Sequence, residues 1–499
     1  MTEGEVEVKV TYPPNGSAAP PGQAAPTMPA VPPQAGSAQA VPAAQTTAPA
    51  PPRRPAWVEG RDRLRAAATT EPGKLRIIGA VLALLVVAFG AVTTWQMTSR
   101  SDAANSVLNR SQPLSADAAA IYRSLADANT AASSGFLAGG QEPADVRDRY
   151  NRDIKSASEK LATAASNAGA GSSAATSVSE LNKLLPEYTG LIERARASNR
   201  QGLPLGGAYL RYANDKMQKQ MLPAAEKLYT AENQRLSADY DDAKPYPWFA
   251  IALGLLALAA LVWAQRRNYQ RTNRVFNHGL VAATAASAVV LLWLVAGHTF
   301  ARSGLSDSYD HGVKSLNVLN DARIDSLKAR GNENLTLVSR GAETVEVGTG
   351  DDAEIKDKFD VDYQASMKRL GSAETGLLGK AVAIADDDAG KNPVKDAAKN
   401  VSVWKDRHKT ARDIDDAGNY KGALDKIVGD KKDEPTGECF DNVDDALEVA
   451  LAHEQREFKQ AADDGKSAMA GLPVGAAVLA VLAAAGAVLG IGRRLSEYR

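Results

Sequence analysis

The side chains best suited to catalysis or metal binding are few in this sequence and lie far apart. Cys439 is the one cysteine, which excludes an intrachain disulfide and a cysteine-based zinc site. We interpret it as an incidental residue, with an intermolecular disulfide outside the membrane as the alternative. The five histidines show no pair at the spacing of metal ligands: His278, His298, His311, His408 and His453. The sequence also lacks the HExxH, GxSxG and Gly-rich phosphate-loop motifs. We therefore expect no catalytic site, no metal and no cofactor.

Acidic side chains are the other candidates for binding cations or a basic partner. The run from Asp386 to Asp388 and the pair Asp351 and Asp352 lie in residues 302–471, where acids outnumber bases. Such runs are usually solvated helix surface, although they could also steer a basic partner or bind cations. The run at Asp386 lacks the ligand spacing of an EF-hand loop. The whole chain has 58 Lys and Arg against 59 Asp and Glu, so its charge does not indicate a nucleic-acid partner.

Four apolar runs are long enough to cross a bilayer, which needs about 20 residues of helix. We place the four membrane spans at residues 75–95, 247–264, 279–301 and 472–491. The first run has no charge from Ile77 to Ser99. It is too far from the amino terminus and too long for a cleaved signal peptide, so we expect an uncleaved anchor. Gly486 and Gly490 form a GxxxG spacing that permits close packing of membrane helices.

Lysines and arginines near the ends of the spans predict the orientation. They cluster in the basic segment 57–74, in the loop 265–278 and in the tail 492–499. With four spans these three segments lie on one side, and the positive-inside rule makes that side cytoplasmic. We therefore expect a multi-pass protein of the cell membrane with both termini in the cytoplasm.

The predicted cytoplasmic pieces are small. Residues 1–56 are rich in Pro and Ala and are expected to be a disordered tail, either a spacer or a proline-rich docking segment. No kinase, cyclase, phosphatase or DNA-binding domain fits in these pieces. The candidate residues for docking a cytoplasmic partner are four arginines of the loop: Arg266, Arg267, Arg271 and Arg274. The simpler interpretation of these four arginines is that they set the membrane topology and contact lipid headgroups. No ligand-binding residue can be assigned.

Two large segments, residues 96–246 and 302–471, are expected on the outer face as helical bundles. Apolar residues recur in them at alternating intervals of three and four, and strand-like alternation is nearly absent. One such stripe contains Leu181, Leu184 and Tyr188. Glycine-rich breaks divide each segment into about four helices, the usual number in a bundle. The predicted fold is an all-α membrane protein with four transmembrane helices and two extracytoplasmic helical bundles.

The two halves resemble one another, which predicts a tandem duplication. Each half is a span, a helical segment and a second span. Tyr188 and Trp404 precede Gly202 and Gly418 by the same interval, and each second span opens near proline.

These features favour a receptor or signal transducer over an enzyme, a transporter or a channel. The spans have no charged residue in their middle, which transporters usually need. Packed helices with discrete arrangements can convey a signal, and the absence of an output domain then requires a separate cytoplasmic protein. Direct ligand sensing by the bundles and a structural role in a cell-envelope complex are the alternatives.

Two resemblances sharpen this hypothesis. Residues 114–140 (LSADAAAIYRSLADANTAASSGFLAGG) and 202–229 (GLPLGGAYLRYANDKMQKQMLPAAEKLY) resemble the four-helix-bundle sensor modules of chemoreceptors and histidine kinases. The chain departs from chemoreceptors because no HAMP or signalling helix follows its last span.

The architecture from about Arg61 to Arg499 is similar to a family of actinobacterial four-span membrane proteins. Residues 71–96 (EPGKLRIIGAVLALLVVAFGAVTTWQ), residues 263–277 (WAQRRNYQRTNRVFN) and the two-half layout carry that resemblance. It implies a relay in which an extracytoplasmic glutamate-binding lipoprotein senses aspartate or glutamate. A soluble Ser/Thr kinase of the kinase G family then responds inside and adjusts glutamate metabolism.

Overall fold

The computed structural model describes residues 69–272, 277–348, 353–429 and 431–495. The described residues all belong to one compact unit. The expected disordered tail at 1–56 lies outside the described residues. The described part is almost entirely helical, which confirms the predicted all-α membrane fold.

The first half contains seven α-helices among the described residues. They are α2 (Glu71–Ser106), α3 (Gln112–Leu137), α4 (Ala144–Asn167), α5 (Ser173–Arg200), α6 (Leu205–Lys216), α7 (Leu222–Ala243) and α8 (Trp248–Thr272). Two π-helical turns, η1 (Val107–Ser111) and η2 (Met217–Met221), join α2 to α3 and α6 to α7.

The second half begins at α9 and ends at α16. Its helices are α9 (His278–Asp307), α10 (Lys314–Ser339), α11 (Lys358–Leu370), α12 (Gly376–Ile384), α13 (Asp388–Asp416), α14 (Tyr420–Val428), α15 (Thr436–Ser467) and α16 (Leu472–Leu495). The π-helical turn η3 (Ser308–Val313) joins α9 to α10, and η5 (Lys431–Asp433) is a short 3₁₀ turn.

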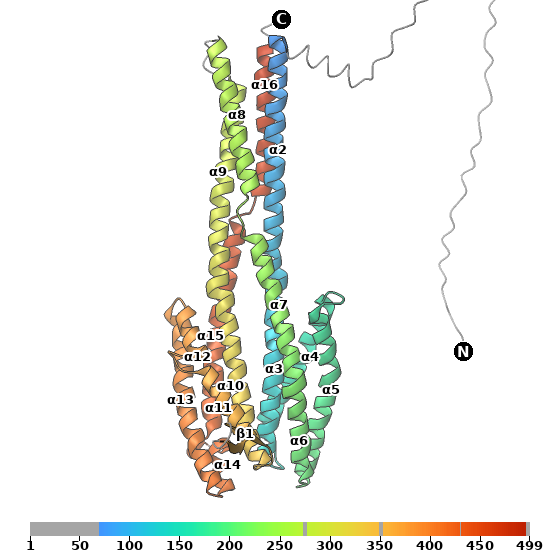
Figure 1. Cartoon of the computed structure of the whole chain (residues 1–499), viewed down its shortest axis with the longest axis vertical. Helices are drawn as coiled ribbons and strands as arrows, with labels where there is room; N and C mark the ends of the chain where they lie inside the picture. The colour runs from blue at the N-terminus through green and yellow to red at the C-terminus, as the bar shows by residue number, and fades with distance from the viewer. Residues whose placement is uncertain (1–68, 273–276, 349–352, 430, 496–499) are drawn as a thin grey trace, which may run out of the picture. The chain divides into compact units, whose positions relative to one another are not determined.

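Four helical stretches of the described chain contain a segment long and apolar enough to cross a membrane: Pro72–Leu137, Leu205–Gln270, His278–Ser339 and Thr436–Arg493. The apolar helices within them are α2, α8, α9 and α16. Figure 1 shows that α2 continues into α3, and α9 into α10, without a loop. By contrast, residues 244–247 separate α7 from α8, and residues 468–471 separate α15 from α16. In each half one connection to the membrane segment is therefore an unbroken helix and the other is interrupted.

The three π-helical turns have local causes in the sequence. Pro113 is the second residue after η1, and Pro223 is the second residue after η2. A proline inside a helix lacks an N–H and its ring crowds the carbonyl four residues earlier, which a wider turn relieves. No proline follows η3, but a Cβ on Gly312 would lie 2.8 Å from the Cβ of Phe458, so α15 packs directly against this turn.

Glycines set the packing of α9 against α16 in the membrane segment. A Cβ on Gly279 would lie 2.4 Å from the carbonyl oxygen of Gly486 and 2.6 Å from the Cα of Gly490. The predicted GxxxG contact is thus confirmed, with Gly279 as its partner. Asn277 caps α9 and donates from Nδ2 to the carbonyl of Gly490 at 2.8 Å, which ties the start of α9 to the end of α16.

The first module (residues 112–243) is a bundle of α3, α4, α5 and the α6–η2–α7 helix (Figure 1). Its core contains the predicted stripe, with Leu181 and Tyr188 fully buried and Leu184 nearly so. Ser172 begins α5 because its side chain accepts a hydrogen bond from the Ala175 N–H.

The second module (residues 314–467) is built mainly from α10, α11, α13 and α15, with the short helices α12 and α14 beside them. It also contains an antiparallel hairpin of β1 (Thr344–Val347) and β2 (Glu354–Asp357), with Thr344 opposite Asp357. This hairpin departs from the all-helical expectation for residues 302–471: Thr344–Val347 alternates polar and apolar residues, but the run is only four residues long and exposed.

Both halves share one order of elements: a membrane helix, a π-helical turn, a helical module, an interrupted connection and a second membrane helix. Tyr188 and Trp404, matched by the sequence repeat, are fully buried on the corresponding long helices α5 and α13. This order agrees with the predicted tandem duplication.

Candidate functional site

The two modules meet along α3 and α10, and this interface is our candidate functional site. Polar side chains make many of its contacts. Thr130 Oγ1 donates to the Leu327 carbonyl at 2.9 Å, and Asn334 Nδ2 donates to Ser134 Oγ at 2.7 Å. Because hydrogen bonds are directional and can be exchanged for others, such an interface can adopt a small number of distinct arrangements.

Charged groups extend the interface from α4 to α15. Arg149 of the first module contacts Asp127 at 2.8 Å and reaches Asp444 of the second module at 3.3 Å. Arg323 on α10 also binds Asp444. Burial lowers the pKa of Arg149, but Asp127 and Asp444 raise it by more, so the guanidinium stays charged. Asp444 is therefore held by one arginine from each module.

Cavities flank this interface, and each is lined by residues of both modules. One of them has a volume of about 720 Å³ and is lined by Arg149, Arg152 and Arg330 together with Asp441 and Asp445. Both signs of charge and a volume in the range of small-molecule sites make it able to accept a small polar ligand.

A second cavity, of about 500 Å³, lies between α7 and α10–α12. It brings the carboxylates of Glu226 and Asp321 near the ammonium groups of Lys368 and Lys380. Burial and the neighbouring acids Asp325 and Glu226 raise the pKa of Asp321 to about 6.

The third cavity, of about 460 Å³, contains the carboxyl groups of Asp127 and Asp153. Burial and the charge of Asp127 raise the pKa of Asp153 to about 8. Asp153 therefore holds its proton more tightly than an isolated carboxyl group does, in a pair coupled to Asp127. This is a titratable group at the module interface that sequence spacing did not indicate.

A buried ionic cluster lies inside the second module, next to the interface. Glu333 on α10 is fully buried and contacts Arg330 at 2.6 Å and His408 Nδ1 at 2.9 Å, and Trp404 Nε1 donates to it at 3.1 Å. The other nitrogen of His408 contacts Asp360 at 3.0 Å. Burial alone would raise the pKa of Glu333, yet His408 and Arg330 hold it below its usual value. The sequence signals of this cluster are the spacings Arg330–Glu333 and Trp404–His408.

The first module has an uncharged counterpart of this cluster. Asn129 on α3 accepts from the Tyr188 hydroxyl at 3.4 Å and donates to Asn214 at 2.9 Å. Tyr188 and Trp404, the matched pair of the repeat, thus each bond to the first helix of their own module. Both module cores therefore place an aromatic side chain against their first helix, but the cluster in the second module is charged and the one in the first module is not.

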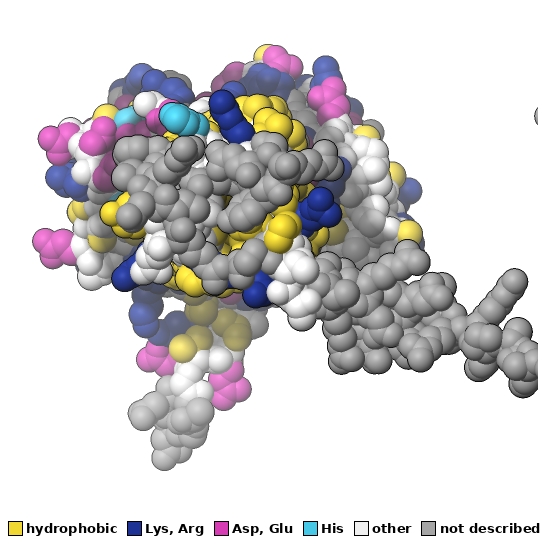
Figure 2. All heavy atoms as spheres, turned by 90° about the horizontal axis from the view of Figure 1, so that it is seen from above, with side chains coloured by type: hydrophobic (Ala, Val, Ile, Leu, Met, Phe, Trp, Pro, Cys, Tyr) yellow, Lys and Arg dark blue, Asp and Glu magenta, His cyan; other side chains and the backbone are white. Residues whose placement is uncertain are grey.

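Three of the four candidate docking arginines, Arg266, Arg267 and Arg271, belong to the end of α8, and Arg274 lies outside the described residues. Arg266 is exposed, and the guanidinium of Arg267 lies 5.4 Å from the centre of the Trp263 ring. The side chains of Arg271 and Arg274 lie outside the described residues. Figure 2 views the end of the molecule at which α8 ends, where Lys and Arg side chains lie beside the apolar helix ends.

The starts of α2 and α9 and the ends of α8 and α16 lie at one end of the bundle of membrane helices (Figure 1). Gly79 of α2 contacts Ile491 of α16, which agrees with this placement. The described basic residues near these helix ends, Lys74, Arg76, Arg266, Arg267 and Arg493, thus belong to one end of the membrane helices. Cys439 is buried in α15, so its thiol is not available for an intermolecular disulfide in this structure.

Residues 103–241 match the model of a family described as actinobacterial sensor domain. The first module is similar to these sensor domains. The matched region runs from the end of α2 through α7 and stops before the second membrane helix. No curated protein and no solved structure matches the chain. Together with the four apolar helices, the match fits a membrane sensor.

Proposed function

We propose that this protein is a non-enzymatic transmembrane signal transducer of the cell membrane. The observation that carries the proposal is the pair of unbroken helices, α2–η1–α3 and α9–η3–α10, which join a membrane segment to each module. A change at the α3–α10 interface moves these helices directly, because no loop intervenes to absorb it. The similarity of the first module to actinobacterial sensor domains supports a sensing role.

The signal in this proposal is the extracellular availability of aspartate or glutamate. An extracytoplasmic solute-binding lipoprotein carries it to the modules, and a cytoplasmic Ser/Thr kinase receives it. The resemblance to the actinobacterial four-span family supports both partners. In this arrangement both termini are cytoplasmic, and Arg266, Arg267, Arg271 and Arg274 contribute to kinase docking.

The test is recovery of the kinase with the intact protein from solubilised membranes. Replacing the four loop arginines by glutamine is expected to lower kinase recovery more than about tenfold, since several charge-assisted contacts are lost together. A charge-matched control removes four lysines from α13 in the second module instead: Lys395, Lys399, Lys405 and Lys409. This control is expected to leave kinase recovery unchanged.

Unchanged recovery and unchanged kinase-dependent metabolism in the arginine variant would overturn the docking role of the loop. Equal losses in both variants would show that net charge, rather than the loop, governs recovery. Recovery of no kinase by the unaltered protein would overturn the relay itself.

Direct ligand sensing by the modules is a second candidate function, favoured by the cavities between them. Calorimetry of the full-length protein in lipid nanodiscs, without any partner, distinguishes the two functions. Heat of binding with aspartate or glutamate alone favours direct sensing. Binding that requires the lipoprotein favours the relay.

A further inference from the structure

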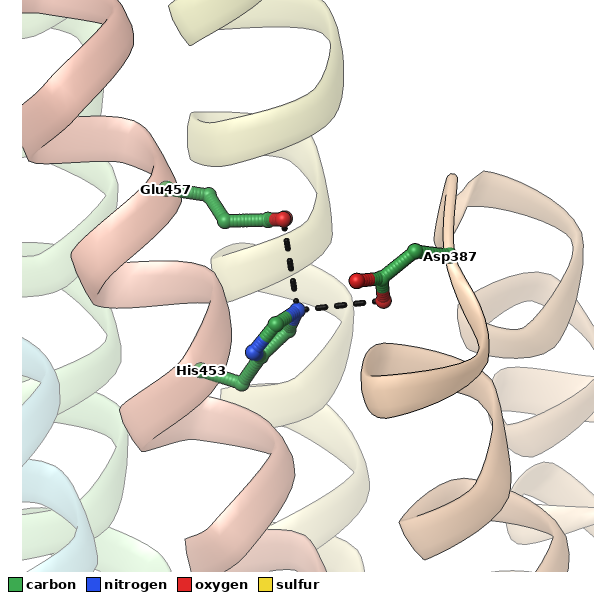
Figure 3. Close-up of side chains that lie close together, drawn as sticks. All are labelled: Asp387, His453 and Glu457. Atoms are coloured by element: carbon green, nitrogen blue, oxygen red, sulfur yellow. Dashed lines mark hydrogen bonds and ion pairs between the residues drawn. The ribbon is translucent and has the colours of Figure 1, made fainter.

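Three side chains of the second module converge at a point away from the module interface. Asp387 lies in the loop that precedes α13, and His453 and Glu457 lie one helical turn apart on α15 (Figure 3). His453 Nε2 is 3.1 Å from a carboxylate oxygen of Asp387 and 3.3 Å from one of Glu457. The three candidate donor atoms all lie within 4.8 Å of one another.

These distances suit a bound metal ion. Zinc is held by imidazole nitrogen and carboxylate oxygen at about 2.0–2.2 Å, which places tetrahedral ligands about 3.4 Å from each other. The two distances from His453 Nε2, 3.1 Å to Asp387 and 3.3 Å to Glu457, are already close to that separation. One imidazole and two carboxylates leave a fourth position for water or for a group from a partner. The side chain of Asp387 is 47 % exposed, so an ion can reach the site from solvent.

The surroundings of the triad carry excess negative charge. Asp386 and Asp388 flank Asp387 in the chain, and Glu454 is buried beside His453. Among the described residues, no lysine or arginine forms an ion pair with Asp387 or Glu457.

The candidate donor oxygens of Asp387 and Glu457 lie within 4.8 Å of each other. A divalent cation would offset the repulsion between these carboxylates.

The triad lies where it can influence the connection to the membrane. α15 packs against η3 and leads to α16. His311 of η3 also lies near the residues that precede the triad, with its Nδ1 3.5 Å from the Ile384 carbonyl. An ion bound to the triad would join the loop before α13 to the helix that continues toward the membrane.

We propose that Asp387, His453 and Glu457 bind a divalent transition-metal ion, with Zn²⁺ the ion best suited to this ligand set. The ion fixes the loop between α12 and α13 to α15. The sequence did not predict this site, because Asp387 is distant in the chain from the other two residues. The spacing of His453 and Glu457, four residues apart on one helix, is the one local signal.

The test uses the full-length protein, purified with a tag that contains no histidine and treated with a chelator. Zn²⁺ is then titrated in competition with a chromophoric chelator. The unaltered protein is expected to bind one equivalent, and Asp387→Asn, His453→Gln and Glu457→Gln are each expected to weaken binding more than about tenfold. Asparagine also caps helices well, so Asp387→Asn can retain the hydrogen bond from the Gly390 N–H that begins α13.

Matched controls remove the same kinds of group nearby. Asp388→Asn removes one adjacent carboxylate, and His311→Gln removes the neighbouring imidazole; both are expected to bind Zn²⁺ as the unaltered protein does. Bound Zn²⁺ should also raise the Tm of the unaltered protein and of the controls, but not of the triad variants. Equal affinity in the triad variants, or no binding by the unaltered protein below about 1 mM, overturns the proposal.

Discussion

Glu333 is a carboxylate at the centre of a buried network, and its environment predicts a large effect of mutation. Replacing it by glutamine leaves the charge of Arg330 unpaired in the core and removes an acceptor of His408. Breaking a buried ion pair in this way typically costs about 3–5 kcal/mol. We expect Glu333→Gln to lower the free energy of unfolding in detergent by an amount in that range, measured by chemical denaturation.

Glu448 provides the matched control for Glu333. It also pairs with an arginine, Arg323, but its side chain is 67 % exposed. Exposed ion pairs contribute about 0–1 kcal/mol, so Glu448→Gln should have little effect. Similar losses in both variants would contradict the structural role assigned to Glu333.

The raised pKa of Asp153 predicts how the free energy of unfolding depends on pH. Its pKa is raised from 3.8 to about 8 in the folded protein, so the folded state binds more protons than the unfolded state between these values. The stability due to this proton is fully present below about pH 4 and is lost as pH rises through about 8. We expect Asp153→Asn to change Tm least at about pH 4 and to raise it progressively more as pH increases toward 8. Asp148→Asn, at an exposed position of the same helix, should not alter the slope.

At the scale of elements, close contact of α9 with α16 requires glycine. A Cβ at Gly279 would meet backbone atoms of Gly486 and Gly490, which cannot move aside as a side chain can. We expect Gly279→Ala to destabilise the helix pair by about 1–3 kcal/mol, measured as thermal unfolding in nanodiscs. At Gly190, inside α5, a Cβ meets nothing within 4 Å. Gly190→Ala should therefore stabilise the protein by about 0.4–1 kcal/mol, and destabilisation there would contradict this account.

The π-helical turn η1 predicts where deletion of a single residue is tolerated. A π-helical turn accommodates one residue more than an α-helical path, so deleting Asn109 from η1 can convert the turn to α-helix and keep both flanking helices in register. Deleting Ala128, in the middle of α3, instead rotates the following residues by about 100°. We expect the Asn109 deletion to fold and the Ala128 deletion to fail, as judged by yield and Tm of the membrane-extracted protein. Equal failure of both would contradict this role of η1.

For the whole molecule, signalling should require movement between the modules. Asn334 and Ser134 contact each other across the interface. In a Cys439→Ala background, Asn334→Cys combined with Ser134→Cys should form a disulfide under oxidation and abolish the amino-acid-dependent output. The response is measured before and after reduction.

Ser124 and Ser156 supply the control pair for this experiment. Their hydroxyl oxygens are 3.3 Å apart, but both lie in the first module. A disulfide between cysteines at these two positions should leave the response intact. Loss of response in the control pair alone would show that signalling depends on movement within a module.

The sequence was sufficient for features that repeat along a helix. Tyr188 and Trp404 were recognised because apolar stripes and the internal repeat place them in cores. The spans and the GxxxG contact followed from composition and spacing. Glu333, Asp444 and Asp153 could not be found in this way, because their importance depends on partners distant in the chain. A charged residue in a helical sequence is most often at the surface, and only packing shows which are buried.

The difference between unbroken and interrupted connections has a mechanical consequence. A continuous helix is stiff along its axis, so α2 and α9 transmit an axial displacement of their modules over their full length. The breaks at residues 244–247 and 468–471 interrupt the helical backbone, so α8 and α16 are not continuous with the modules. Each half thus pairs one membrane helix that is continuous with its module and one that is not. A cytoplasmic partner that contacts the starts of α2 and α9 would therefore respond most directly to a difference in their positions along the membrane normal.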